Sequence, residues 1–524
     1  MQKEMKLDTL PDHVLLRLCG SLGARELATL ECLARHFREE RCELQDAGGR
    51  WWSGTAAECA AERQVRGHKE GWRVEKRPEE SWKYVLFVLE TELLSPLHLV
   101  AAGPEHTLVL RQTGRPAVFA FGSDDWKQLG LGDSEEMVVH HDDGYTIGDP
   151  NKTDHKALPQ EIVRLRGRRI VSVAAGGAHS AALTDDGSLL TWGSGAYTTC
   201  RSPTGGQLGH GPLPATGEYG TVVSAPRVIT RFPRGTRVSQ VACGHSHTAC
   251  ITSTGELFTW GEGGKQLGHG DRQNRHTPKR VEALASERVI DLDCADGVTV
   301  AVTAAGDFYR WGEGPYTFDD RGPKPRKVRF PAGVKIRRAS CSYLTYAAVD
   351  TEGVLYTWGV AEYHRLGHGG EWNNEKTPKA VTTLAGHRVA QVSCGSEQTM
   401  AVTEDGELWT WGRDDWGELG RYPDWDDDVD EDDPPPGGEF PVRVTEGLPI
   451  SGTWGDCTCR LQKSARVQEV SCGEHKHTAI VMESGEVCTF GSACNGKLGL
   501  AGVDVRGGFR GGTVDLPRVV ELPA

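Results

Sequence analysis

One unit recurs seven times between residues 100 and 520, and this recurrence limits the fold more than any other feature of the chain. Its clearest copy is VACGHSHTACITSTGELFTWGEGGKQLGHGD at residues 241–271. The shared pattern is a V-x-C/A-G segment, a His-Thr pair, a T-x-x-G-x-L-x-x-W-G segment and a Leu-Gly pair, followed by a Pro-x-x-Val segment. A fixed period of this kind indicates a repeat fold in which each copy is one supersecondary unit.

The spacing within the copies indicates strands. In five copies the residue after the Cys/Ala position precedes the tryptophan by 16 residues, and the first and seventh copies stretch this distance to 18 and 17. Each copy offers about four short segments of alternating apolar and polar residues, separated by glycine-containing turns such as DDG and STG. Four short antiparallel strands in each of seven copies predict a mainly β fold, a seven-bladed β-propeller over residues 99–524.

The repeat resembles the regulator of chromosome condensation repeat family, which implies a seven-bladed propeller over about 99–520. The fourth copy departs most, because Ala295 replaces glycine and no Leu-Gly pair follows Trp311. No Pro-x-x-Val segment precedes Val100, and the last one, Pro517–Val520, has no copy after it. We therefore expect the C-terminal strand to complete the first blade.

Residues 1–98 carry no repeat, and their apolar spacing predicts a helical segment at 1–50 and a helical linker at 51–98. One interpretation is a small helical cap. The other is that residues 7–39 resemble the F-box motif, with its opening Leu-Pro and helices of this length. This resemblance implies that a Skp-type adaptor protein binds Leu10, Pro11, Val14, Leu15, Leu18, Leu22, Leu27, Leu30 and Phe37.

Composition excludes several classes of protein. The chain has 59 Lys and Arg against 73 Asp and Glu, a formal charge of −14, which argues against a protein that coats nucleic acid or an anionic membrane. No apolar run approaches the roughly 20 residues of a membrane span. Five of the 15 cysteines share one repeat position, which indicates small buried side chains rather than disulfides, and we expect a reduced cytoplasmic or nuclear location. These five are Cys243, Cys294, Cys341, Cys394 and Cys472.

No catalytic or metal site is predicted. His245 with His247 and His475 with His477 have the spacing of metal-binding pairs, but four histidines occupy one repeat position, which favours a structural histidine bonded to backbone within its blade. These four are His106, His179, His247 and His477. No second zinc-spaced pair follows Cys457 and Cys459, and no nucleophile elbow or phosphate loop is present in the sequence. We therefore predict neither a cofactor nor an enzyme active site.

Loop lengths indicate where a partner binds. From the Trp/Phe position to the Pro position the seven copies span 38, 34, 18, 14, 20, 30 and 27 residues, so the long connections belong to copies six, seven, one and two. Equivalent connections emerge on one face, which predicts a partner-binding arc there and places the loop at 445–466 on the opposite face. The acidic run at 424–433 fits a solvated loop, a contact for a basic partner or a loosely held divalent cation. The predicted contact residues are His140, His141, Asp142, Asp143, Trp425, Asp426, Asp427 and Asp428.

Three functions follow from these resemblances. The F-box resemblance implies a substrate receptor of a Skp–cullin–F-box ubiquitin ligase, whose propeller holds a target protein. The repeat resemblance implies, alternatively, a guanine-nucleotide exchange factor for a Ran-like small GTPase. A UV-B photoreceptor has the same fold and a Gly-Trp-Arg-His-Thr string in successive blades, but the matching positions here, such as GHSHT and GSEQT, lack tryptophan, which disfavours this function.

Overall fold

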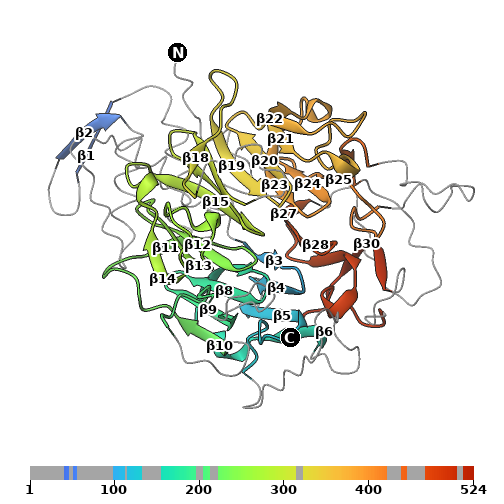
Figure 1. The fold of residues 1–524 in the computed structure, drawn as a ribbon, viewed down its shortest axis with the longest axis horizontal. Coiled ribbons are helices and arrows are strands. Elements are labelled where there is room, and N and C mark those ends of the chain that lie inside the picture. Colours follow the sequence, from blue (N-terminus) through green and yellow to red (C-terminus); the bar gives the residue numbers. More distant parts are fainter. Residues whose placement is uncertain are drawn as a thin grey trace, which may run out of the picture. The chain divides into compact units, whose positions relative to one another are not determined.

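In the computed structural model the chain divides into two units, Met1–Ser95 and Pro96–Ala524, and Figure 1 shows the strands of the second unit arranged as a ring. The residues that the structure describes are 41–45, 51–55, 98–112, 115–132, 155–195, 205–212, 222–313, 323–421, 438–444, 466–503 and 512–523.

The described part of the first unit is a pair of antiparallel strands. Strand β1 (Arg41–Gln45) pairs antiparallel with β2 (Trp51–Thr55), with Arg41 opposite Thr55. Aromatic residues favour strands and the intervening sequence contains two glycines, which is typical of a turn. These two segments are therefore strands within a region predicted to be helical. The F-box-like residues at 7–39 and residues 56–97 of the predicted helical linker lie outside the described residues.

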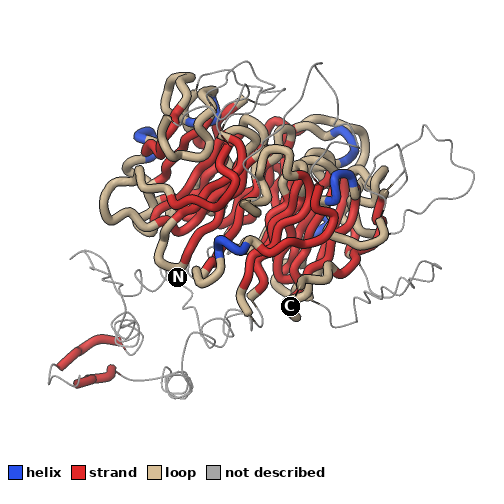
Figure 2. Tube along the Cα trace, turned by 90° about the horizontal axis from the view of Figure 1, so that it is seen from below, coloured by secondary structure: helices blue, strands red, loops and turns tan. Residues whose placement is uncertain are grey.

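The second unit is a seven-bladed propeller, as predicted from the repeat. Its seven sheets each hold four antiparallel strands, which run between two faces formed by loops (Figure 2). The blades, from first to seventh, are β3 (Val100–Ala102), β4 (His106–Arg111), β5 (Ala117–Ser123) and β6 (His155–Glu161); β7 (Ile170–Ala175), β8 (His179–Thr184), β9 (Leu189–Ser194) and β10 (Val222–Val228); β11 (Val238–Cys243), β12 (His247–Thr252), β13 (Leu257–Gly261) and β14 (Arg275–Arg280); β15 (Val289–Ala295), β16 (Val298–Thr303), β17 (Phe308–Gly312) and β18 (Arg326–Lys327); β19 (Ile336–Cys341), β20 (Thr345–Asp350), β21 (Leu355–Gly359) and β22 (Glu375–Ala380); β23 (Val389–Cys394), β24 (Gln398–Thr403), β25 (Leu408–Gly412) and β26 (Val442–Arg443); β27 (Val467–Cys472), β28 (His477–Met482), β29 (Val487–Ser492) and β30 (Thr513–Val519). Short 3-10 turns occur in the connections: η2 (Val163–Leu165), η3 (Lys265–Leu267), η4 (Glu282–Leu284), η5 (Glu362–His364), η6 (Thr382–Leu384) and η7 (Cys494–Gly496).

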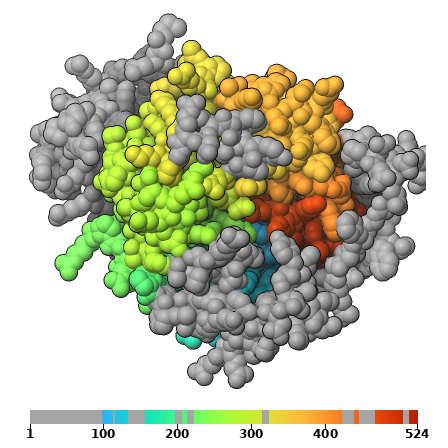
Figure 3. Space-filling model, in the orientation of Figure 1, coloured from blue at the N-terminus to red at the C-terminus, as the bar shows by residue number. Residues whose placement is uncertain are grey.

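The ring closes differently from our prediction. The C-terminal strand β30 pairs with β29, with Arg518 opposite Thr489, and so completes the seventh blade, while β3 to β6 form the first blade without it. The prediction was wrong because each repeat copy runs from the innermost to the outermost strand of one blade. Among the described strands none is shared between blades, and the first and seventh blades meet through the contacts of β3 with β27 and β28. Residues of the two blades lie side by side in the space-filling view, blue beside red (Figure 3).

Side-chain hydrogen bonds join the first and seventh blades. The Leu99 amide donates to Glu469 Oε2 at 2.7 Å, and the Ala102 amide donates to Ser471 Oγ at 3.0 Å. The Thr107 hydroxyl donates to the Lys497 carbonyl at 2.8 Å. These groups are buried or half-buried, and a buried amide left without an acceptor costs about 1–3 kcal/mol. The closure therefore depends on particular polar side chains rather than on a shared strand.

The conserved pattern within the repeat produces a hydrogen-bonded connection between neighbouring blades. In four blades the tryptophan indole of the third strand and a hydroxyl of the second strand both donate to one carbonyl in the Leu-Gly turn of the preceding blade, at 2.7–3.0 Å. The pairs and their acceptors are Ser180 and Trp192 with Gln128, Thr248 and Trp260 with Gln207, Thr299 and Trp311 with Gln266, and Thr399 and Trp411 with Arg365.

The repeat histidines act between blades, not within them as predicted. His179 Nε2 lies 2.9 Å from Thr248 Oγ1, and His247 Nε2 lies 2.9 Å from Thr299 Oγ1, in each case in the next blade. Because each hydroxyl donates its proton to a carbonyl, Nε2 is the donor to the hydroxyl oxygen. Burial lowers the pKa of His179 and of His247 to about 3, so both imidazoles are neutral. A side chain at Gly176 would come within 2.5 Å of the His179 ring, which explains the glycine at this position.

The junction between the fourth and fifth blades is aromatic instead. The fourth copy lacks the Leu-Gly pair, and the fifth has Tyr346 where other copies have Thr or Ser. Tyr346 stacks on Trp358 with ring centroids 5.6 Å apart and an interplanar angle of 18°, while Phe308 meets Trp358 edge-on at 5.1 Å. Such pairs contribute about 0.5–1.5 kcal/mol beyond their buried area. The irregular copy thus replaces a polar connection with an apolar one.

Candidate interaction face and axial channel

The loops of the propeller divide between two faces. Because the strands of each blade alternate in direction, the connections after the first and third strands share one face, which we call the upper face. The four long connections all follow third strands, and blades six, seven, one and two are neighbours through contacts of their inner strands. The connection after β26, which contains 445–466, leaves from the other face.

The predicted contact residues fall on parts of these connections that the structure does not describe. His140, His141, Asp142 and Asp143 lie within 133–154, and Trp425, Asp426, Asp427 and Asp428 lie within 422–437. Their role in partner binding remains a prediction.

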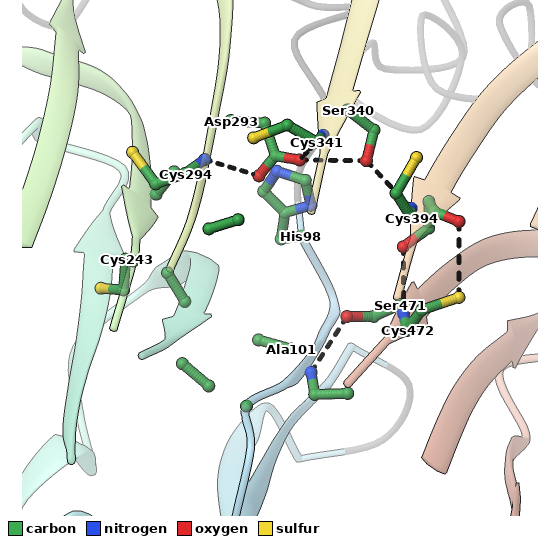
Figure 4. A pocket seen from close by; sticks show the side chains of 18 of the residues that line it. His98, Ala101, Cys243, Asp293, Cys294, Ser340, Cys341, Cys394, Ser471 and Cys472 are labelled. Carbon is green, nitrogen blue, oxygen red and sulfur yellow. Dashed lines mark hydrogen bonds between the residues drawn. The ribbon is translucent and has the colours of Figure 1, made fainter. Parts of the chain in front are cut away.

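A channel of about 140 Å³ runs along the propeller axis and is lined by the first strands of all seven blades (Figure 4). The five cysteines of the repeat position end these strands or lie near their ends, and all five are buried and free, as interpreted from the sequence. Burial raises the pKa of Cys243 and of Cys472 to about 12, so these thiols stay protonated. Their environment makes them inert packing groups.

Polar side chains in the channel bond to the free edges of the inner strands. Asp293 accepts hydrogen bonds from the Cys341 amide at 2.9 Å and the Ser340 hydroxyl at 3.0 Å, and Ser340 Oγ accepts from the Cys394 amide at 3.1 Å (Figure 4). An innermost strand has no neighbouring strand on its inner side, so its amides need other acceptors. Burial raises the pKa of Asp293 to about 6 despite these bonds. The sequence did not reveal this role, because the partners come from different copies.

His98 anchors the start of the propeller. Its amide donates to Ser172 Oγ at 3.3 Å, and its ring nitrogen Nδ1 lies 3.1 Å from Glu469 Oε1. Burial lowers the pKa of His98, but the hydrogen bond and the charge of Glu469 outweigh burial, so its pKa is raised overall. The imidazole and Glu469 therefore form a charge-assisted contact between the first and seventh blades.

One loop crosses the axis on the upper face. The seventh copy has one residue more than the central copies between Cys472 and its histidine, and Lys476 adopts a left-handed φ of 61°. Glu474 Oε1 accepts a hydrogen bond from the Asp296 amide of blade four at 2.9 Å, and its carbonyl accepts one from the Ser396 hydroxyl of blade six at 2.5 Å. This loop of the seventh blade therefore reaches blade four across the channel mouth and also bonds to its neighbour, blade six.

The described residues hold no group of three or more His, Cys, Asp or Glu side chains arranged to bind a metal ion. No helix among them is long and apolar enough to cross a membrane. Three aromatic side chains in upper-face connections are exposed, Tyr343, Trp372 and Phe440, and the sequence predicted none of them; Trp372 and Phe440 are the most exposed. They lie in irregular connections of blades five and six, where no periodicity signals exposure.

Comparison with known proteins agrees with the geometry. The Regulator of chromosome condensation (RCC1) repeat model matches residues 117–183, 186–251, 254–302 and 352–402, and a second model of the same description matches 170–198, 238–266 and 389–417. Over these residues the propeller consists of regulator of chromosome condensation repeats.

Two relatives cover different shares of the chain. The E3 ubiquitin-protein ligase HERC2 of Mus musculus is 37% identical over 258 residues, 48% of this chain and 5% of that protein. The Ultraviolet-B receptor UVR8 of Arabidopsis thaliana is 29% identical over 413 residues, 77% of this chain and 78% of the receptor. This chain therefore matches only a twentieth of the length of the ligase.

Solved structures share the propeller fold. Prp20p from Saccharomyces cerevisiae superposes with a TM-score of 0.60 at 18% identity, over 79% of this chain and 87% of Prp20p, and is described with its binding to Gsp1p and histones. Human WBSCR16 superposes with a TM-score of 0.59 at 19% identity, over 78% of this chain and 95% of its own. At these identities the likeness shows the fold alone.

Proposed function

We propose that this chain is a non-catalytic protein-binding module, and that it serves as a substrate receptor of a Skp–cullin–F-box ubiquitin ligase in the cytoplasm or nucleus. In this proposal residues 7–39 bind a Skp-type adaptor and the upper face of the propeller binds the target protein. The observation that carries the protein-binding part is the clustering of four long connections on one arc of the upper face. Irregular loops on a rigid scaffold are a common position for binding residues.

The ring suits this role because it is rigid. Paired hydrogen bonds from tryptophan and hydroxyl groups connect successive blades, and buried side chains join the seventh blade to the first. A scaffold of this kind holds loops in fixed relative positions, which reduces the entropy lost when a partner binds.

Capture of a purified Skp-type adaptor tests the ligase part. We expect the full chain to capture the adaptor and residues 98–524 to fail. The double variant Leu10→Ala, Pro11→Ala should lose capture while its propeller melts at the parent temperature. If the parent chain does not bind the adaptor, or the double variant still does, the receptor proposal is wrong and a plain interaction scaffold remains.

A second candidate function is nucleotide exchange on a Ran-like small GTPase. It is supported by the fold shared with Prp20p, whose structure is described with binding to Gsp1p. Release of a fluorescent GDP analogue from such a GTPase, with and without the full chain, tests it. A release rate that does not rise with chain concentration would exclude exchange on the GTPase used.

A further inference from the structure

An exposed aromatic cluster stands on the upper face at blades five and six. It consists of Tyr363, His364 and Trp372, from the connection between β21 and β22, and Phe440, which precedes β26; we call it the aromatic platform. Trp372 is 46% exposed and Phe440 is 45% exposed, the largest values among the aromatic side chains that the structure describes. Exposed aromatic residues of this size are enriched at the energetic centres of protein interfaces.

Trp372 is fixed in place although it is exposed. Its indole nitrogen donates to His364 Nε2 at 3.0 Å, and its ring centroid lies 5.5 Å from that of Tyr363 and 5.9 Å from that of His364. The N–H group is thus satisfied within the chain. A partner can therefore contact the π face of the Trp372 ring. Because the contacts within the chain already fix the rotamer of this side chain, binding costs less conformational entropy.

The backbone beneath the platform is strained. Tyr363 and His364 adopt left-handed φ angles of 57° and 56°, where the turns of blades six and seven have glycine at the position of His364. Bulky residues rarely adopt this conformation, and they persist in it only where their surroundings compensate. The Arg413 guanidinium lies 4.4 Å from the Tyr363 ring centroid, and that of Arg365 lies 5.5 Å away. The same left-handed conformation recurs at the equivalent Lys127 of blade one and Asn495 of blade seven, with φ angles of 58° and 62°, so it belongs to this turn of the repeat and not to the platform alone.

The charged side chains around the platform differ in how far they are exposed and in whether they are paired within the protein. Arg413 is bonded to Glu397 at 3.1 Å and to Asp415, so its charge is compensated within the protein. The carboxylate of Glu362 is 48% exposed, and Glu371, next to Trp372, and Glu439, next to Phe440, are exposed as well. The Gly369 amide donates to the Glu439 carbonyl at 3.2 Å, which holds the two connections together. Glu362 lies 3.9 Å from an Arg365 guanidinium nitrogen, whereas the exposed carboxylates of Glu371 and Glu439 each adjoin one of the two exposed rings in the sequence.

We infer that the aromatic platform binds an arginine side chain in a basic segment of a protein partner. The planar guanidinium stacks on the face of Trp372, and Glu371 and Glu439 accept hydrogen bonds from its partner segment. Arginine fits better than lysine because its planar, weakly hydrated cation can stack and bond to carboxylates at once. The inference deepens the proposed protein-binding function by naming the chemistry of the partner, and it does not depend on the adaptor.

Fluorescence anisotropy with the full chain and labelled peptides tests the inference. The probes are GRGRGRG, GKGKGKG and GEGEGEG, at low and at physiological salt. We expect the arginine peptide to bind most tightly, the lysine peptide more weakly, and the glutamate peptide not at all. Trp372→Ala should weaken arginine-peptide binding by about tenfold, the scale of one lost cation–π contact. Glu371→Gln with Glu439→Gln should weaken it and flatten its salt dependence.

Val354→Ala is the matched control, since Val354 is 39% exposed in a turn on the opposite face. It should bind the arginine peptide as the parent does, and all variants should melt within a few degrees of the parent. Equal binding by Trp372→Ala, equal affinity for lysine and arginine peptides, or no binding of the arginine peptide by the parent would each overturn the inference. Adaptor capture by the same preparations separates this outcome from that of the proposed function.

Discussion

The indole nitrogen of Trp260 lies 2.9 Å from the carbonyl oxygen of Gln207, a residue of the preceding blade. The Thr248 hydroxyl donates to the same oxygen at 2.9 Å. One backbone carbonyl in a turn therefore holds two strands of the next blade. This relationship explains why the repeat fixes a hydroxyl residue, a tryptophan and a Leu-Gly turn together.

Replacing Trp260 by phenylalanine removes one of the two donors and part of a fully buried ring. We expect the free energy of unfolding to fall by about 1–3 kcal/mol, from the lost hydrogen bond and the smaller side chain. Urea unfolding followed by circular dichroism measures the change. Trp409→Phe is the control, because Trp409 is only partly buried and its indole bonds within its own blade. An equal loss in both variants would contradict the special role of the inter-blade bond.

Glu418→Gln should stabilise the protein increasingly as pH rises. Glu418 is buried, its Oε2 accepts from the Trp416 amide at 2.7 Å, and burial followed by the charge of Asp414 raises its pKa from 4.5 to about 8. The folded protein keeps a proton on Glu418 that the unfolded chain releases above pH 4.5. The free energy of unfolding of the parent protein therefore falls as the pH rises from about 4.5 to about 8, because of this group. We expect a gain on the order of 2–4 kcal/mol for the variant at pH 8 and little at pH 4.

The first blade offers the matched control for this prediction. Gln128 occupies the equivalent position and accepts from the Trp126 amide at 2.8 Å. Gln128→Glu should therefore lose stability as pH rises from 5 to 8, the opposite of Glu418→Gln. Thermal melting of both variants across this pH range measures the two slopes, and parallel slopes would show that burial does not hold the proton on Glu418.

Deleting residues 513–524 removes β30, the outermost strand of the seventh blade, and leaves β29 as a free edge. We expect insoluble protein or a large drop in melting temperature, because an uncovered edge promotes aggregation. Deleting only 521–524 keeps the strand and should change the melting temperature by a few degrees at most. A longer deletion that melts like the full chain would mean that β30 contributes little to the seventh blade.

Shortening the long connections separates stability from binding. Trimming 421–440 or 131–155 towards the 14-residue length of copy four should change the free energy of unfolding by less than about 1 kcal/mol, since loop closure entropy varies slowly with length. Each trim should reduce capture of a partner that the full chain retains. Full capture by both, with loss when the opposite-face loop 445–466 is removed, would mean that the other face is the binding face.

The sequence predicted what lies within one copy and failed where copies meet. The strands, the buried tryptophans and the buried cysteines follow from local periodicity and the 16-residue spacing. The histidine partners could not be predicted, because His179 bonds to Thr248, 69 residues away in the next blade. Ring closure was misjudged for a similar reason, since a cyclic pattern does not say which strand of a copy is innermost. The aromatic platform could not be predicted because its residues lie in connections whose sequences do not follow the repeat pattern.

Every blade is formed by one continuous segment of the chain. The order of the blades in the sequence can therefore be changed without changing their order around the ring. A cut between two blades, with a linker joining residue 524 to residue 98, leaves all seven sheets covalently intact. Circular permutants opened at such boundaries would keep every strand pairing. Only the position of the chain termini around the ring would change. Whole blades could then be duplicated, exchanged or relocated as cassettes, limited by the side-chain contacts at each border.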